Sequence, residues 1–344
     1  MIHRILCLLT LAALVACTDD SQLPAQEIRG HAMGTNYQVV IVDPAEGLPL
    51  ETLQMQLQRR IEQIEDIAST YRDTSAISKF NRSRSTDWIA VPAEFCSMIA
   101  AATNISRETA GAFDPTVGAL VNLWGFGPDF LQNELPGDAE IARALASSGE
   151  KNLASDCANT RLRKSEPGLQ IDLSGWAKGY AVDQLADILD AAGQASYLVE
   201  IGGEIRVSGW NTEREPFAIA IERPDTASVD GVAVLNVTDT GIATSGDYRN
   251  YFEHDGVRYS HTIDPRNGKP VRHTLTAVTV LHPSAAYADA MATALLVLGF
   301  DDAIRYANDH AIAAYFAVRE DDRLAYEPSA AFAAEKYLHT SADP

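Results

Sequence analysis

The chain has 344 residues, with 27 Lys and Arg against 47 Asp and Glu, and its formal net charge is −20. This length allows one large domain or two smaller ones, and a hydrophobic content of 46% argues against disorder outside the ends. The acidic balance disfavours nucleic-acid binding, which uses basic surfaces, and charge-driven adhesion to anionic lipid.

The first residues indicate an export signal. Arg4 precedes an apolar run over 5–15 that is too short to span a bilayer. The sequence Leu14-Val15-Ala16-Cys17 follows and resembles the lipobox of bacterial lipoproteins. This resemblance implies a signal peptide over 1–16, lipidation of Cys17 and a polar tether over 17–26. A plain signal peptide with an incidental cysteine is the alternative.

Two further cysteines, Cys96 and Cys157, lie in the mature part of the chain. An exported protein could pair them, but two cysteines far apart in sequence do not establish a disulfide. No Cys-x-x-Cys or His-x-x-His spacing suggests a zinc or haem site.

The folded part is predicted to be one α+β domain over 27–338, with a large, mostly antiparallel sheet system flanked by helices. Apolar spacing predicts helices over 50–71, 93–108, 138–146, 286–298 and 302–308, and another that begins at Ala177. Strands are predicted over 27–42, with an interruption at 32–35, and over 197–201, 204–208, 217–222, 232–237, 259–263, 275–281 and 312–318.

The sequence Ala112-Phe113-Asp114-Pro115 follows the second helix. A residue before proline is pushed away from helical dihedrals, so Asp114 could cap whatever begins at Pro115. The aromatic stretch over 124–128 is interpreted as a rigid loop engaged in local packing.

The stretch 170–183 reads as a strand end, a tight turn and a helix start. Residues 170–173 alternate between polar and apolar, Ser174 and Gly175 break the run, and helical spacing begins at Ala177. A helix start presents free N–H groups that suit a phosphate, and Lys178 adds a cation while Asp172 adds a carboxylate. An ordinary βα turn with a surface lysine is the alternative.

A further turn follows His261, in the sequence His261-Thr-Ile-Asp264-Pro-Arg-Asn-Gly268. The Asp-Pro-x-x-Gly pattern is a strong turn signal, and His261 precedes it where a strand should end. That position suits a general base or a phosphate donor, although a lone histidine is as often structural.

Asp289 is the only charged residue in the sequence between Ser284 and Phe300. It shares a helix face with Thr293, four residues later, and a carboxylate on so apolar a helix is costly when buried without a partner. Carboxylate and hydroxyl oxygens suit Mg²⁺, which completes its shell with phosphate and water. An Asp bonded to a backbone amide or to an arginine is the alternative.

Taken together, these motifs resemble the ApbE family of FAD:protein FMN transferases, over nearly the whole mature chain. In chain order they are Met33-Gly-Thr, Ser69-Thr-Tyr71, Ala112-Phe-Asp-Pro115, Asp172-Leu-Ser-Gly-Trp-Ala-Lys-Gly179, Thr244-Ser-Gly-Asp-Tyr248, His261 to Gly268 and Ala288-Asp-Ala-Met-Ala-Thr293. Two departures from the family pattern, the bulky Trp176 and Asn267 in the turn, concern substrate details more than the reaction class.

The resemblance implies that FAD is contacted by Met33, Tyr71, Ala112, Phe113, Asp114, Asp172, Lys178 and Ile263. It implies that Mg²⁺ is held by the side chains of Asp289 and Thr293 and by the backbone carbonyls of Gly175 and Ala292. For the base that activates the acceptor hydroxyl, residue type and motif position nominate His261, with Asp247 and Asp264 as alternatives.

By this resemblance the enzyme would transfer FMN from FAD onto a threonine hydroxyl of a target flavoprotein and release AMP. The target would be a subunit of a membrane redox complex, reached from a lipid anchor on the periplasmic side of the inner membrane. The same residues would also serve an FAD pyrophosphatase with water as the nucleophile, or a non-catalytic FAD-binding lipoprotein.

Overall fold

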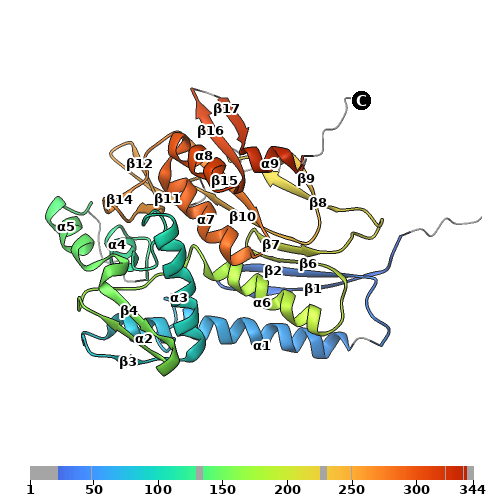
Figure 1. The fold of residues 1–344 in the computed structure, drawn as a ribbon, viewed down its shortest axis with the longest axis horizontal. Coiled ribbons are helices and arrows are strands. Elements are labelled where there is room, and N and C mark those ends of the chain that lie inside the picture. Colours follow the sequence, from blue (N-terminus) through green and yellow to red (C-terminus); the bar gives the residue numbers. More distant parts are fainter. Residues whose placement is uncertain are drawn as a thin grey trace, which may run out of the picture.

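The computed structural model describes residues 22–47, 49–128, 135–224, 231–248, 250–321, 323–335 and 337–338. Its centre is an eight-stranded antiparallel sheet (Figure 1). In spatial order the strands are β1 (Ala25–Ala32), β2 (Thr35–Val42), β6 (Ser196–Ile201), β7 (Glu204–Ser208), β10 (Thr240–Gly246), β15 (Leu275–His282), β16 (Ala313–Glu320) and β17 (Arg323–Pro328).

Both faces of this sheet are covered. Strand β2 shows the consequence, because Val39 and Ile41 pack in one apolar cluster while Val40 and Val42 pack in another. A strand buried on both faces reads as a continuous apolar run rather than an alternation. One face carries α1 (Leu50–Ala68), α6 (Ala177–Ala191), α7 (Ala285–Leu298) and α8 (Phe300–Asp309) (Figure 1).

The other face is covered by a two-stranded ribbon and a short helix. These elements are β8 (Phe217–Glu222), β9 (Gly231–Val237) and α9 (Ala330–Ala334). Two small hairpins precede β15, formed by β11 (Tyr251–His254) with β12 (Val257–Ser260) and by β13 (Ile263–Asp264) with β14 (Lys269–Pro270).

A smaller helical region packs beside α7 (Figure 1). It contains α2 (Ala76–Arg82), β3 (Ile89–Ala90), α3 (Ala93–Glu108), α4 (Gly118–Leu123), α5 (Asp138–Ser147), η1 (Glu150–Asn152), β4 (Leu153–Asp156), η2 (Cys157–Asn159) and β5 (Arg161–Lys164). A disulfide between Cys96 on α3 and Cys157 on η2 fastens it, which answers the pairing that the sequence left open.

The predicted α+β class with a large antiparallel sheet is confirmed, as are the helices that begin at Leu50, Ala93 and Ala177. The interruption predicted at 32–35 is the turn of the β1–β2 hairpin. Met33 and Gly34 there have φ angles of 52° and 75°, which suits a two-residue turn of the primed type.

Two local predictions were wrong. Residues 170–173 form no strand but an extended segment with a single bridge from Gln170 to Val117, because the Asn81 side chain takes both backbone groups of Ile171. The strand predicted over 259–263 is split between β12 and β13. The capping role predicted for Asp114 is confirmed, because its carboxylate accepts the Thr116 N–H in the turn that begins at Pro115, ahead of α4.

The N-terminal signal and residues 17–21, which include Cys17, lie outside the described residues. The tether predicted over 17–26 is shorter at its far end, because β1 already begins at Ala25. Among the residues that the structure describes, no helix is both long and apolar enough to cross a membrane.

Candidate functional site

A cavity of about 580 Å³ opens where α6 and α7 meet the central sheet. This volume lies in the range of small-molecule sites. Its wall gathers segments that are far apart in sequence: the 112–114 loop, the start of α6, the start of β7, the end of β10, the 261–265 segment and α7. Of the residues predicted to act, the wall contains Tyr71, Ala112, Phe113, Asp114, Asp172, Gly175, Lys178, His261, Ile263, Asp289 and Thr293.

Asp289 lies on the cavity side of α7 and is 4% exposed. One of its oxygens, Oδ2, accepts a hydrogen bond from the Gly179 N–H in the first turn of α6 at 3.1 Å. The amide partner considered from the sequence is therefore present. Burial raises the pKa of the Asp289 carboxyl, and the nearby Lys178 opposes that rise.

Thr293 lies one turn further along α7 and also faces the cavity. Its hydroxyl is 3.0 Å from the Ser245 hydroxyl on β10. Gly175 lies against it, because a Cβ atom at Gly175 would come within 2.9 Å of Thr293 Oγ1. The glycine therefore lets the turn before α6 approach this hydroxyl closely.

This donor set fits a hard divalent cation. It offers the Asp289 carboxylate, the Thr293 hydroxyl and the backbone of Gly175 within one small region of the wall. Within the described ranges there is no group of three or more His, Cys, Asp or Glu residues that could hold a metal. A cation here would need phosphate and water oxygens to complete its shell, as Mg²⁺ commonly does.

Glu204, the first residue of β7, lies in the same wall and was not found from the sequence. It is 3% exposed and forms an ion pair with Lys178. Burial and the charge of Asp289 raise the pKa of Glu204 to about 8, while Lys178 opposes this rise. The lysine at the mouth of α6 is thus held by a buried carboxylate.

The turn before α6 is ordered by its own acidic residue. Asp172 Oδ1 accepts the Ser174 N–H at 2.7 Å, and the Asp172 N–H donates to the Pro115 carbonyl at 2.8 Å. This second bond joins the turn to the segment that follows Asp114. Burial raises the pKa of Asp114, and its bonds with Thr116 oppose the rise.

Tyr71 lies at the rim of the cavity. The residue is 72% exposed, and its hydroxyl donates to the Phe126 carbonyl at 3.4 Å. Phe126 itself lines the cavity, so the aromatic loop does more than pack locally. An exposed aromatic ring at a rim can stack on a planar ligand.

His261 is oriented by one backbone carbonyl. The Asn250 carbonyl lies 2.9 Å from His261 Nδ1 and also accepts the His261 N–H at 3.1 Å. A carbonyl can only accept, so Nδ1 carries a proton, and Nε2 is the acceptor of the neutral ring. Burial lowers the pKa of His261, which favours that neutral form.

The other two base candidates do not line the cavity. Asp264 accepts from the Arg266 side chain, the Arg266 N–H and the Asn267 amide, so it serves the turn that was predicted there. Asp247 has a pKa raised by burial, with Arg258 opposing the rise, and among the described residues its Oδ1 has no hydrogen-bond partner.

Met33 and Ala292 also lie outside the cavity wall. Met33 is in the β1–β2 turn, where its N–H donates to Glu65 at 2.9 Å. Thr35 in the same hairpin is close to Gly202, which does line the cavity. Ala292 is fully buried on α7 next to Thr293.

Comparison with known proteins identifies the fold and the family. The sequence profile of the ApbE family matches residues 33–316. The FAD:protein FMN transferase of Vibrio cholerae serotype O1 is 39% identical over 334 residues, which cover 96% of this chain and 98% of the relative. The enzyme of that name from Haemophilus influenzae is 36% identical over 337 residues, covering 96% and 97%.

Solved structures agree with this assignment. The flavin transferase ApbE from Vibrio cholerae superposes with a TM-score of 0.82 at 38% identity, covering 90% of this chain and 99% of that one. The apo form of the Pseudomonas stutzeri flavinyl transferase ApbE gives 0.84 at 39% identity, covering 91% and 97%. The chain therefore belongs to the ApbE family.

Proposed function

We propose that this protein is a Mg²⁺-dependent FAD:protein FMN transferase, which moves FMN from FAD to a threonine hydroxyl of a target flavoprotein and releases AMP. One observation carries the proposal: Lys178, Gly175, Asp289 and Thr293 come from two distant segments and meet in one cavity wall. The family assignment and the names of the relatives support the flavin part of it.

The reaction exchanges the phosphoanhydride bond of FAD for a phosphoester bond to the threonine. The threonine oxygen attacks the phosphorus of the FMN half, a new phosphorus–oxygen bond forms, and the bond to the bridging oxygen breaks. AMP leaves with that oxygen, and the hydroxyl proton passes to a base. Because a threonine hydroxyl is a weak nucleophile, both its position and the base matter.

The residues of this chain suit these steps. Asp289, Thr293 and the Gly175 carbonyl would hold the cation, which when bound neutralises charge on the diphosphate oxygens. Lys178 lies at the start of α6, where an ammonium group and helix N–H groups favour a phosphate. His261 Nε2 can accept the hydroxyl proton, since Nδ1 is committed to Asn250.

We also propose that the protein works from a lipid anchor on Cys17, at the periplasmic side of the inner membrane. Residues 1–16 would be the removed signal peptide and 17–24, up to the start of β1, the tether. The target would then be a subunit of a membrane redox complex. Metabolic labelling with a fatty acid tests the anchor, and loss of the label in a Cys17→Ser variant would support it.

The function is tested by mixing the protein, FAD, Mg²⁺ and a candidate flavoprotein subunit. A fluorescent protein band that survives denaturation, and disappears when the acceptor threonine is replaced by valine, supports transfer. Free FMN and AMP without a labelled partner would instead indicate an FAD pyrophosphatase. Bound FAD that remains intact would contradict both activities.

A further inference from the structure

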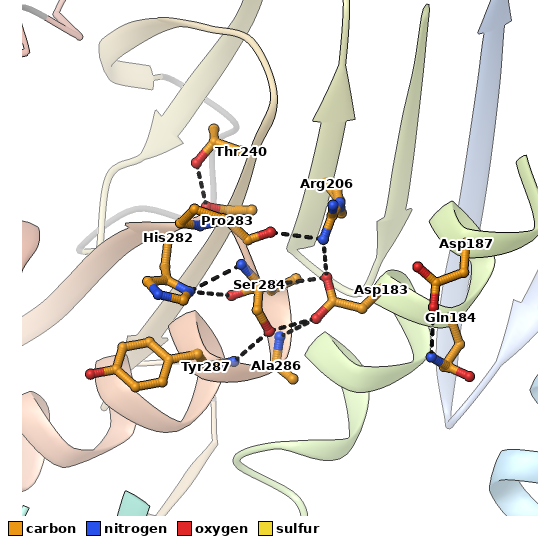
Figure 2. A network of polar contacts seen from close by, with 12 residues as sticks. Asp183, Gln184, Asp187, Arg206, Thr240, His282, Pro283, Ser284, Ala286 and Tyr287 are labelled. Carbon is orange, nitrogen blue, oxygen red and sulfur yellow. Dashed lines mark hydrogen bonds and ion pairs between the residues drawn. The ribbon is translucent and has the colours of Figure 1, made fainter. Parts of the chain in front are cut away.

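The first turn of α7 is fixed to α6 by the carboxylate of Asp183. Asp183 Oδ1 accepts the Ala285 N–H at 2.9 Å, and Oδ2 accepts the Ala286 N–H at 3.0 Å and the Ser284 hydroxyl at 2.7 Å (Figure 2). The first N–H groups of a helix have no partner within that helix. Here a side chain from a different helix takes two of them.

The two helices cap each other. Asp183 on α6 binds the start of α7, while Asp289 on α7 binds the Gly179 N–H at the start of α6. The helix starts are also very close, since a Cβ atom at Gly179 would lie 2.3 Å from the Ala285 carbonyl oxygen. The carboxylate proposed to hold the cation is therefore one half of a reciprocal clamp.

Strand β7 is joined to α6 by two ion pairs, and α6 supplies the cation in one and the anion in the other. Lys178 pairs with Glu204, and Asp183 pairs with Arg206 at 2.9 Å. Arg206 also donates to the Pro283 carbonyl at 2.7 Å, just before α7 begins (Figure 2). Asp183 thus joins α6, α7 and β7 at a single carboxylate.

Strand β10 meets the same junction. A Cβ atom at Gly241 would lie 2.7 Å from the Ala285 backbone nitrogen, so the start of α7 is wedged between Gly241 and Gly179. Further along, β10 carries Ser245 to the hydroxyl of Thr293. The placement of Ala285 therefore affects both sides of the proposed cation site, the α6 side through Gly179 and the β10 side through Gly241.

We propose that Asp183 is a positioning residue, which holds Asp289 and Thr293 against the turn before α6 so that a divalent cation and a dinucleotide diphosphate bind together. This inference rests on the proposed function. An asparagine at this position would place an amide NH₂ among N–H and O–H donors, so it could not keep all four contacts. The start of α7 would then shift relative to Gly175 and Lys178.

Equilibrium FAD binding, followed by flavin fluorescence during Mg²⁺ titration, tests the proposal without using activity. Asp183→Asn should raise the Mg²⁺ concentration for half-maximal FAD binding by about tenfold or more, the size typical for residues that orient metal ligands. Asp187→Asn is the matched control, because Asp187 lies one turn further on α6 and bonds Gln184 of its own helix (Figure 2). It should change the value less than about twofold.

A capping variant remote from the cavity separates positioning from general stability. Ser329→Ala removes the cap that the buried Ser329 gives to the Phe332 N–H of α9 and lowers stability, but it touches no bond of Asp183. An equal Mg²⁺ shift in Ser329→Ala at equal loss of stability would overturn the proposal.

If Asp183→Asn does not fold, Asp183→Glu carries the same expectation, because it keeps the charge but displaces the carboxylate by one methylene group. If FAD binding to the wild type depends on Mg²⁺ and both Asp183 variants show the same Mg²⁺ dependence, the positioning role alone is overturned. Wild-type FAD binding that does not depend on Mg²⁺ overturns the cation site of the proposed function as well.

Discussion

Lys178 and Glu204 form an ion pair in the cavity wall, and the glutamate is almost fully buried. Lys178 is therefore oriented by the protein before any ligand arrives. Its field at a phosphate is partly offset by the same partner. Removing one member of a buried pair leaves the other charge uncompensated, which typically costs about 3–5 kcal/mol.

We expect Lys178→Met to destabilise the protein, and Lys178→Met with Glu204→Gln to regain most of that loss. The loss should be larger at pH 9 than at pH 6, because the pKa of Glu204 is about 8 and at pH 6 the carboxyl can hold a proton instead of a charge. Urea unfolding at both pH values measures this. Neither variant should regain FAD binding, so a double variant that binds FAD normally would remove Lys178 from the ligand site.

His261→Ala should slow FMN transfer by about 10²–10⁴-fold, the usual contribution of a general base, while FAD binding changes little. Burial lowers the pKa of His261 below its usual 6.5. The wild-type rate should therefore be constant near neutral pH and fall only when the pH drops below 6.5 and the ring takes up a proton. Single-turnover transfer over a pH series measures both effects. A His261→Ala variant that transfers at the wild-type rate would rule the histidine out as the base.

Asp289→Asn should abolish Mg²⁺-dependent FAD binding and transfer without unfolding the protein. The pKa of the Asp289 carboxyl is higher in the native state than its unfolded value of 3.8. Between these two pKa values the native state binds more protons than the unfolded state, so the metal-free wild-type protein should lose stability as the pH rises from one to the other. The asparagine variant lacks this loss. Thermal unfolding without metal should therefore show equal or higher stability for Asp289→Asn near neutral pH, and a large decrease would contradict the interpretation.

Part of the site could be predicted because some residues stand out in their local sequence. Asp289 is a single charge in an apolar helix, and its burial follows from that pattern. Glu204 gives no such signal, because Glu204 and Arg206 alternate with apolar residues as in any half-exposed strand. Its burial depends on α6, which supplies Lys178 from another part of the chain.

The wrong local predictions have the same origin. The alternation over 170–173 is real, but the backbone groups there bond to Asn81 and Pro115 instead of a neighbouring strand. Residues 259–263 have continuous strand propensity, yet Ser260 Oγ accepts the Thr262 N–H and ends the pairing. Such contacts between side chain and backbone depend on the tertiary fold and not on periodicity.

The disulfide should contribute about 4 kcal/mol to the stability of the helical region, because it closes a loop with a sequence separation of 61. Cys96→Ser with Cys157→Ser should lower the urea midpoint, and FAD affinity should stay nearly unchanged because neither cysteine lines the cavity. Dithiothreitol should reproduce the shift in the wild type and have no effect on the double variant. If dithiothreitol lowers the urea midpoint of the double variant as much as that of the wild type, the effect of the reductant has another cause than the disulfide.

Lys164 is fully buried, and its ammonium group donates to the Phe80 and Leu169 carbonyls at 3.1 and 3.0 Å. Burial lowers its pKa from 10.5 to about 8. Between these values the native state has lost the proton that the unfolded chain still binds, so stability should rise with pH in this window, by roughly 3 kcal/mol in total. Lys164→Met should lack this rise, and Lys151→Met, at an exposed lysine, should retain it. Urea unfolding at pH 7.5 and 9.5 measures the difference, and identical pH dependence in wild type and Lys164→Met would show that the carbonyls fully offset the burial of the charge.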